Sequence, residues 1–106
     1  GQQKKGQDAS AKSDARNLVS HVESCFADSQ DYTSCDSAAE LGSTGLTYGT
    51  TAGTVQVSAA TTSSFTVTAQ SQSGNVFNVV RSGTGSGYSR TCTTASNGGC
   101  RAGGVW

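Results

Sequence analysis

The sequence predicts an α+β domain in which one long N-terminal amphipathic helix packs on an antiparallel β-meander of about four strands. Three observations lead to this fold class: a helical apolar period in residues 7–28, strand-like alternation in residues 54–92, and four cysteines in a chain of 106 residues. A chain of this length has room for one modest core, so we treat residues 1–106 as a single domain.

Residues 7–28 carry the helical signal. At roughly 100° per residue, their apolar side chains fall within a stripe about 120° wide. The stripe contains Ala11, Ala15, Leu18, Val19, Val22, Cys25 and Phe26, and the opposite side holds Ser13, Asn17, Ser20 and Ser24. Propensity alone does not hold such a helix in water, so the stripe must rest on the sheet. We expect residues 1–6 to be frayed, unless an upstream helix continues through them, and Asp8 to lie in the first turn.

The segment 29–53 predicts a loop that connects the helix to the sheet. Residues 28–31, Asp-Ser-Gln-Asp, favour side-chain to backbone hydrogen bonds and therefore end the helix. Residues 36–41 predict a single helical turn, capped by Asp36 or Ser37.

Residues 54–92 alternate between apolar and polar side chains in four short runs, which turn signals separate. The runs are 54–58, 65–69, 76–80 and 88–92. One face of this meander is polar, and the other is free to cover the helix. The side chains expected to form the helix–sheet core are Leu18, Val22, Phe26, Val55, Val57, Phe65 and Val67.

The four cysteines predict two disulfides and an oxidising compartment. Three pairings are possible in principle, and we favour Cys25–Cys35 and Cys92–Cys100, because neighbours in sequence close small loops easily. Residues 92–106 then form a closed loop and a tail, whose Trp106 is expected to pack back onto the sheet edge.

The composition favours an exported, β-rich surface protein. Hydrophobic residues make up only 33% of the chain, so the core should be thin and helped by cross-links. Seven basic and seven acidic residues give a formal charge of zero. A neutral chain has no electrostatic footprint for nucleic acid or an anionic membrane, and the abundant Ser and Thr keep its surface wet.

No complete catalytic or metal-binding set is evident, so we expect neither an enzyme nor a cofactor. His21 precedes Cys25 by four residues, a spacing that suits two zinc ligands with Cys35 as a third. A helical His beside a disulfide is the favoured interpretation, because no carboxylate or second His completes the set. The run from Gly83 to Gly87 predicts a hairpin loop, since the Lys-Ser/Thr and the following helix of a phosphate-binding loop are missing.

Three arginines allow a second interpretation of the sheet. Arg81, Arg90 and Arg101 could share a surface and bind an anion such as a nucleic-acid phosphate. The neutral total charge favours ordinary solvated strand positions instead. Convergence of these arginines with Lys4 and Lys5 on one face would support salt-dependent DNA binding.

The order of helix, disulfide-closed loop, meander and C-terminal disulfide loop resembles the globular part of a bacterial type IV pilin. The resemblance is carried by residues 11–18 (Ala-Lys-Ser-Asp-Ala-Arg-Asn-Leu), 22–28 (Val-Glu-Ser-Cys-Phe-Ala-Asp), 65–69, 74–77 and 90–92. The first two stretches look like the C-terminal half of the family's long first helix. The family's hydrophobic N-terminal segment and its processing site are not in this sequence, and Gly1 fits a cut just past them.

The resemblance implies a structural subunit of a surface filament used in adhesion, motility or DNA uptake. Its partners would be other pilin subunits and the pilus assembly machinery. Its location would be the cell surface, after passage through the inner or plasma membrane as a precursor that acquires a methylated N-terminus. The alternative is a minor pilin or a type II secretion pseudopilin that acts as a binding or assembly module for DNA or a surface ligand. A small secreted hydrolase would need His21 as its base. Without the apolar segment, we expect residues 1–106 to be monomeric.

Overall fold

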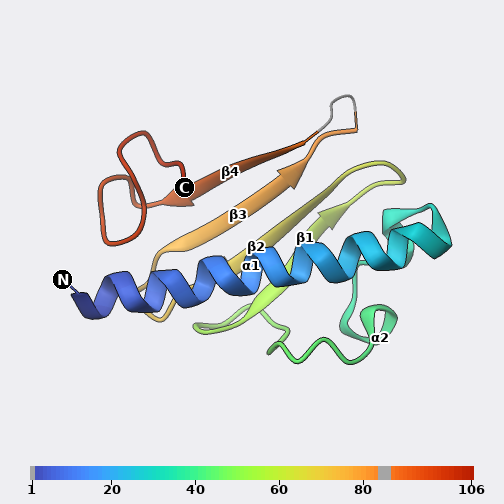
Figure 1. Ribbon diagram of the computed structural model, residues 1–106, viewed down its shortest axis with the longest axis horizontal. Coiled ribbons are helices and arrows are strands. Elements are labelled where there is room, and N and C mark those ends of the chain that lie inside the picture. Colours follow the sequence, from blue (N-terminus) through green and yellow to red (C-terminus); the bar gives the residue numbers. More distant parts are fainter. Residues whose placement is uncertain (1, 84–86) are drawn as a thin grey trace.

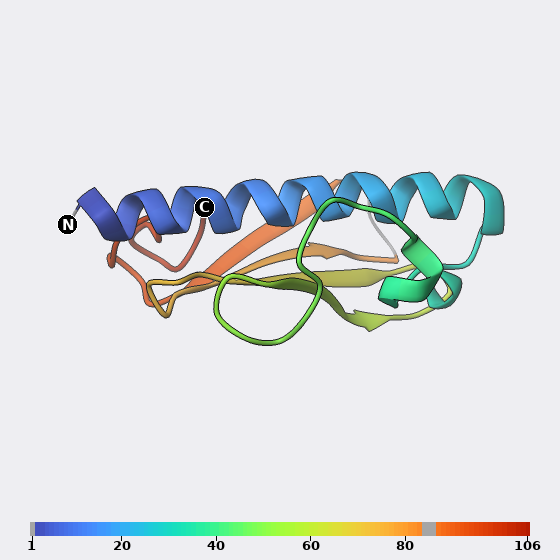
Figure 2. The ribbon, with the colours of Figure 1, turned by 90° about the horizontal axis from the view of Figure 1, so that it is seen from below.

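A long helix lies across one face of a four-stranded antiparallel sheet in the computed structural model (Figure 1). The structure describes residues 2–83 and 87–106. The elements are helix α1 (Gln2–Ser29), the 3-10 turn η1 (Tyr32–Ser34), helix α2 (Ala38–Leu41), and strands β1 (Val55–Ala60), β2 (Phe65–Gln70), β3 (Val76–Arg81) and β4 (Tyr88–Thr93). Figure 2 shows the two layers from the side, with the middle of α1 above the sheet and its N-terminal turns above the C-terminal loop. The predicted α+β fold, a helix on a meander, is therefore correct.

Helix α1 begins earlier than the apolar period indicates. It starts at Gln2 and not at residue 7, so the prediction that residues 1–6 are frayed is wrong for Gln2 onward. A contact far away in sequence holds this extension, because the Lys4 Nζ donates a hydrogen bond of 2.9 Å to the Asn97 Oδ1. Asp8 consequently lies well inside the helix, and its predicted place in the first turn is also wrong.

The sheet follows the predicted meander, with strand order β1-β2-β3-β4. Val67 lies opposite Val57 on one side and Val79 on the other, which places the alternating apolar side chains on the face beneath α1. A register shift between Val57 and Ala59 interrupts the β1–β2 ladder. The predicted hairpin loop of residues 83–87 falls largely outside the described residues.

One hydrophobic cluster joins the helix to strands β1, β2 and β3. Its members include Ala11, Ala15, Leu18, Val22, Val55, Val57, Phe65, Val67, Phe77 and Val79, all of them buried. Phe26 is only partly buried and packs at the margin of this cluster. Its ring stacks on Tyr32 with centroids 4.0 Å apart, because the chain has already turned back there towards the end of α1.

The outer face of the sheet is polar, as the alternation predicts. A row of hydrogen bonds crosses the middle strands on this face, linking the Ser58 and Thr68 hydroxyls at 2.7 Å and the Thr68 hydroxyl to the Asn78 Oδ1 at 2.8 Å. The face opposite α1 is thus mostly neutral and polar, with Val76 and Val80 of β3 as its apolar members.

The loop after α1 is tied to the helix and to the first strand. Cys35 forms a disulfide with Cys25 in the last turns of α1, and Ser37 caps α2 by accepting from the Glu40 amide. Tyr48 then lies beside Val55, whose amide donates to the Thr47 carbonyl at 3.0 Å. These contacts protect the outer edge of β1, where free backbone groups would otherwise invite pairing with another chain.

The C-terminal segment covers part of the other edge. Cys92 and Cys100 form the second disulfide, and the Cys92 amide donates to the Gly104 carbonyl at 2.8 Å. Trp106 is 8% exposed, and its Nε1 donates to the carbonyls of Thr91 (2.8 Å) and Asn78 (3.1 Å). The predicted return of Trp106 to the sheet edge is confirmed.

Candidate functional site

A buried carboxylate anchors the N-terminal half of α1 to two loops. Asp8 is 0% exposed and accepts four hydrogen bonds, none from a charged group. The donors are the Ser71 hydroxyl (2.6 Å), the Ser73 hydroxyl (2.5 Å), the Asn75 side-chain amide (2.8 Å) and the Gly99 backbone amide (2.7 Å). Asp8 therefore joins the helix to the β2–β3 turn and to the disulfide-closed C-terminal loop.

The environment of Asp8 keeps this carboxylate ionised. Burial, the largest single influence, raises its pKa, but the hydrogen bonds from Ser71, Ser73, Gly99 and Asn75 together outweigh burial and lower the pKa below its ordinary value. The Asn75 side-chain amide also donates to the Asn97 carbonyl at 2.8 Å, which connects the β2–β3 turn directly to the C-terminal loop.

Two glycines let the C-terminal loop approach this carboxylate. A Cβ at Gly98 would lie 2.5 Å from the Asp8 Oδ2, and the φ of this residue, +59°, is one that other residues adopt rarely. A Cβ at Gly99 would lie 2.8 Å from the Asp8 Cβ. The Asn-Gly-Gly run thus allows the contact between Gly99 and Asp8.

A second polar cluster fastens the C-terminal half of α1 to the sheet. The Glu23 carboxylate accepts from the hydroxyls of Tyr32 and Tyr88 and lies 3.8 Å from the Arg81 Nε. Arg81 also donates to the Tyr32 hydroxyl at 2.7 Å. Burial and the hydrogen bond to Glu23 raise the pKa of Tyr88 to about 12, so this phenol stays protonated as a donor.

The charged side chains are separated along the length of the molecule. One half, which we call the basic half, contains Lys4, Lys5, Lys12, Arg16, Arg90 and Arg101, together with Asp8 and Asp14. The other, the acidic half, contains Glu23, Asp28, Asp31, Asp36 and Glu40, together with Arg81. The formal charges are +4 and −4, although the chain as a whole has a formal charge of zero.

A groove between α1 and β4 lies at the inner end of the basic half. The groove has a volume of about 170 Å³ and is lined by Arg16, Val19, Val79, Tyr88 and Arg90. The Trp106 ring lies at its end, with the Cζ atoms of Arg16 and Arg90 at 5.2 and 5.8 Å from the ring centroid. Both guanidiniums are held against an apolar floor, an arrangement suited to a carboxylate or phosphate group.

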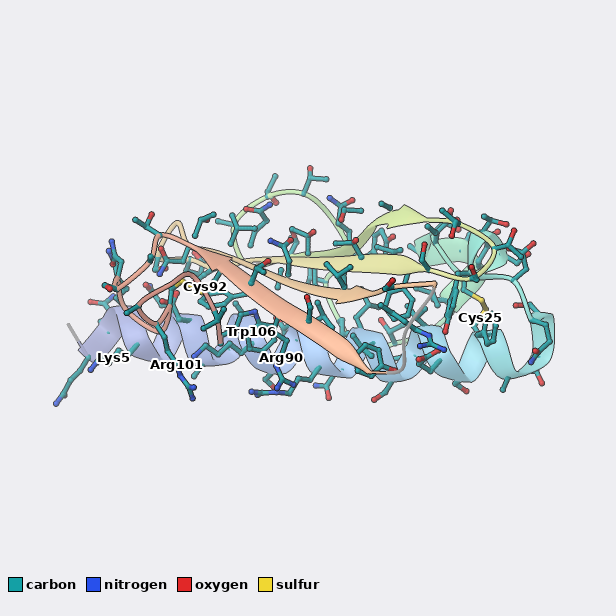
Figure 3. The ribbon with its side chains drawn as sticks, turned by 90° about the horizontal axis from the view of Figure 1, so that it is seen from above. Lys5, Cys25, Arg90, Cys92, Arg101 and Trp106 are labelled. Atoms are coloured by element: carbon teal, nitrogen blue, oxygen red, sulfur yellow. A yellow bond between two sulfur atoms is a disulfide. The ribbon has the colours of Figure 1, made fainter. Side chains whose placement is uncertain are left out.

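Further cations continue this surface towards the N-terminus. Figure 3 shows Lys5, Arg101 and Arg90 following one another along the N-terminal half of α1, while Cys25 lies near its other end. These three side chains are exposed, and none forms an ion pair within the part of the chain that the structure describes. They make the basic half accessible to a partner.

The acidic half has a hollow of its own. It measures about 400 Å³ between the end of α1 and α2, and it is lined by His21, Ser24, Cys25, Asp28, Ser29, Glu40 and Leu41. At the edge of α2, a hydrogen bond with Glu40 raises the pKa of Asp36, and burial and the charge of Glu40 add to this rise. The Asp36 backbone amide lowers the pKa of Glu40.

The structure brings together only some of the residues considered from sequence. Arg90, Arg101, Lys4 and Lys5 lie in one half, whereas Arg81 lies in the other with Glu23. Arg81 and Arg90 lie on strands β3 and β4, and Arg90 is exposed, as the expectation of solvated strand positions has it, although both also make specific contacts. For Arg101 the expectation is wrong, because this residue lies beyond the last strand.

The two disulfides lie at opposite ends of the helix, and both pairings are those favoured from sequence proximity. Cys25 and Cys35 are bonded to each other and present no thiolates beside His21. Across residues 2–83 and 87–106, no group of three or more His, Cys, Asp or Glu side chains is arranged to hold a metal ion. In the same ranges, no helix is both long enough and apolar enough to cross a bilayer.

Asp8 and Arg16 are functional-site residues that the sequence argument missed. For Asp8 a signal existed, since it lies three residues before Ala11 and seven before Ala15, on the apolar stripe. A carboxylate on that stripe indicates burial with partners. Arg16 carries no such signal, because its neighbours Trp106 and Arg90 come from the far end of the sequence.

No family model, curated protein or solved structure that was compared with this chain matches it. The fold and the contacts of its own residues therefore carry the functional argument.

Proposed function

We propose that this chain is a structural subunit of a type IV pilus. One observation carries the proposal: a single long helix covers one face of a meander, and disulfide-closed loops flank the sheet on both sides. That is the element order of the pilin globular part. The neutral polar outer face supports the same function, because a fibre of many copies needs a wetted surface that does not repel itself.

The proposal includes a location and partners. The chain would act at the cell surface, with other copies of itself and with the pilus assembly machinery. Two intramolecular disulfides suit that oxidising setting, where a thin core benefits from cross-links.

A second candidate function draws on the basic half. A minor pilin or pseudopilin that acts as a binding module would use gathered cations to hold an anionic ligand, and Arg16 and Arg90 flank a groove of suitable chemistry. The equal acidic half weakens this candidate, because it repels any extended polyanion laid along the molecule.

Immunogold electron microscopy of the producing cells tests the first proposal. Antibodies raised against the folded, oxidised chain should label filaments along their length, and a strain lacking the gene should show no label. Label confined to filament tips would favour the minor-pilin alternative. Label absent from filaments, with the protein free in the medium, would rule out a filament subunit.

A further inference from the structure

We infer that copies of this chain associate side by side, with the basic half of one copy against the acidic half of the next. This inference rests on the proposed filament function, in which copies lie parallel. Its basis is the separation of a neutral chain into halves of formal charge +4 and −4. No other surface described for these residues is so strongly charged.

Electrostatics then determines how parallel copies are displaced. Two parallel copies in register place like halves together and repel, whereas an axial displacement brings opposite halves together and attracts. The molecule is 42 Å long, so the favoured displacement is about half of that length. Lys5, Arg16 and Arg90 are exposed in the basic half, and Asp28 and Glu40 are exposed in the acidic half, so no refolding is needed.

The local chemistry of the two halves is complementary as well. Arg16 and Arg90 flank the groove over Val19 and Val79. A carboxylate on a short methylene stem fits this arrangement, with the oxygens on the guanidiniums and the stem on the apolar floor. Asp28 and Glu40 border the acidic hollow and present such groups.

A second copy of the chain is complementary to both charged halves, whereas a nucleic acid is complementary to only one. DNA or RNA would neutralise the basic half and leave the acidic half unused and repelled. A second copy satisfies both halves at once and leaves the assembly neutral. Nucleic-acid binding is therefore treated as a competing outcome of the test.

Static light scattering of purified residues 1–106 measures the attraction directly. At about 10 mM salt the Debye length is about 30 Å and the halves of neighbouring molecules interact, whereas at about 150 mM it is about 8 Å and they are screened. We expect a negative second virial coefficient at low salt that rises to zero or above at 150 mM. Stable dimers are not required.

A pair of charge swaps provides the matched comparison. Lys5→Glu with Asp28→Lys keeps the net charge at zero and lowers the end charges to +2 and −2, so the attraction should fall to about a quarter. Lys5→Glu with Asp14→Lys also keeps zero net charge but leaves both halves at +4 and −4, so it should behave as the unchanged chain. The Glu in the first turn and the Lys in the last turn both favour the helix, and circular dichroism verifies folding.

Three results would overturn the inference. The first is no attraction at low salt, and the second is equal attraction in both swapped variants. The third is tight binding of a 20-base-pair DNA duplex by a chain that shows no self-attraction, which would assign the basic half to a polyanion. None of these results affects the filament proposal, which depends on the labelling of cells.

Discussion

At the scale of single residues, Asp8 joins α1 to two loops that are distant in sequence. It accepts four hydrogen bonds from two loops, and it forms no ion pair with the side chains that the structure describes. A buried charge is tolerated when such donors are complete, and removing it leaves the donors unsatisfied.

Asp8→Asn should therefore lower the free energy of unfolding by about 3 kcal/mol, because an amide offers one acceptor where the carboxylate offers two. In one orientation its NH2 group meets the Asn75 and Gly99 donors, and in the other the Ser71 and Ser73 hydroxyls lose their acceptor. Asp14→Asn, on the same helix with no loop to anchor, should change it by less than about 0.5 kcal/mol. Urea unfolding of both variants at neutral pH gives the comparison. Equal losses would contradict the assigned role of Asp8.

The same residue predicts how stability depends on acid. The pKa of Asp8 is lowered in the folded state, so its contribution is complete well above the unfolded value of about 3.9 and is lost as the pH falls through the folded-state pKa. The pKa of Asp31 is also lowered in the folded state, whereas the pKa values of Asp14 and Asp36 are raised. The difference between the unchanged chain and Asp8→Asn isolates Asp8: it should shrink between about pH 5 and pH 2. A constant difference would mean that Asp8 is not ionised in the fold.

At the scale of elements, the helix and the sheet depend on each other. Leu18 and Val22 are 0% exposed and belong to the same cluster as Val55, Phe65 and Val67. An isolated helix of this composition would be marginal in water, so the buried stripe supplies most of its stability.

Truncation on the two sides of α1 should have unequal effects. Leu18→Ala and Val22→Ala should each cost about 2–4 kcal/mol of unfolding free energy, since they open cavities in a thin core. Ser20→Ala and Ser24→Ala, on the exposed side, should stay within about 0.5 kcal/mol. Thermal or urea unfolding monitored by circular dichroism measures all four. Losses of similar size on both sides would mean that the helix is enclosed.

Elements with a regular local pattern could be predicted from the sequence. The apolar period predicted α1 from residue 7, strict alternation predicted four strands within about two residues of their ends, and cysteine proximity predicted both disulfides. The first turn of α1 could not be predicted, because Lys4 is held by Asn97, which lies in a loop at the far end of the sequence.

The candidate site was harder to predict for the same reason. The net charge does not say where the charged residues lie in the fold, so a neutral total gave no sign of two oppositely charged halves. Arg16 and Arg90 come together only after the sheet has formed and the Trp106 ring has packed against both guanidiniums.

At the scale of the whole molecule, the protein is an elongated, thin domain. It is 42 Å long and 16 Å thin, with its charge separated along the long axis and its sheet face neutral. Such a shape offers lateral contacts between copies without a large apolar patch, and only Tyr88 and Val105 stand out as exposed large hydrophobic residues among those described.

Zero-length cross-linking of surface filaments tests the central claim most directly. Lys12 and Asp28 are about 24 Å apart along one helix at 1.5 Å per residue, close to the displacement inferred above, so a carbodiimide bond between them must join two copies. Filaments sheared from cells should yield peptides that join Lys12 to Asp28 or Glu40, and the Lys12–Glu40 peptides, whose residues are unchanged, should become fewer in the Lys5→Glu/Asp28→Lys variant.

Filaments that contain the chain and show these links would support both the subunit function and the displaced packing. Filaments that contain the chain but link only residues of the same half would contradict the packing. Filaments without the chain would contradict the function itself.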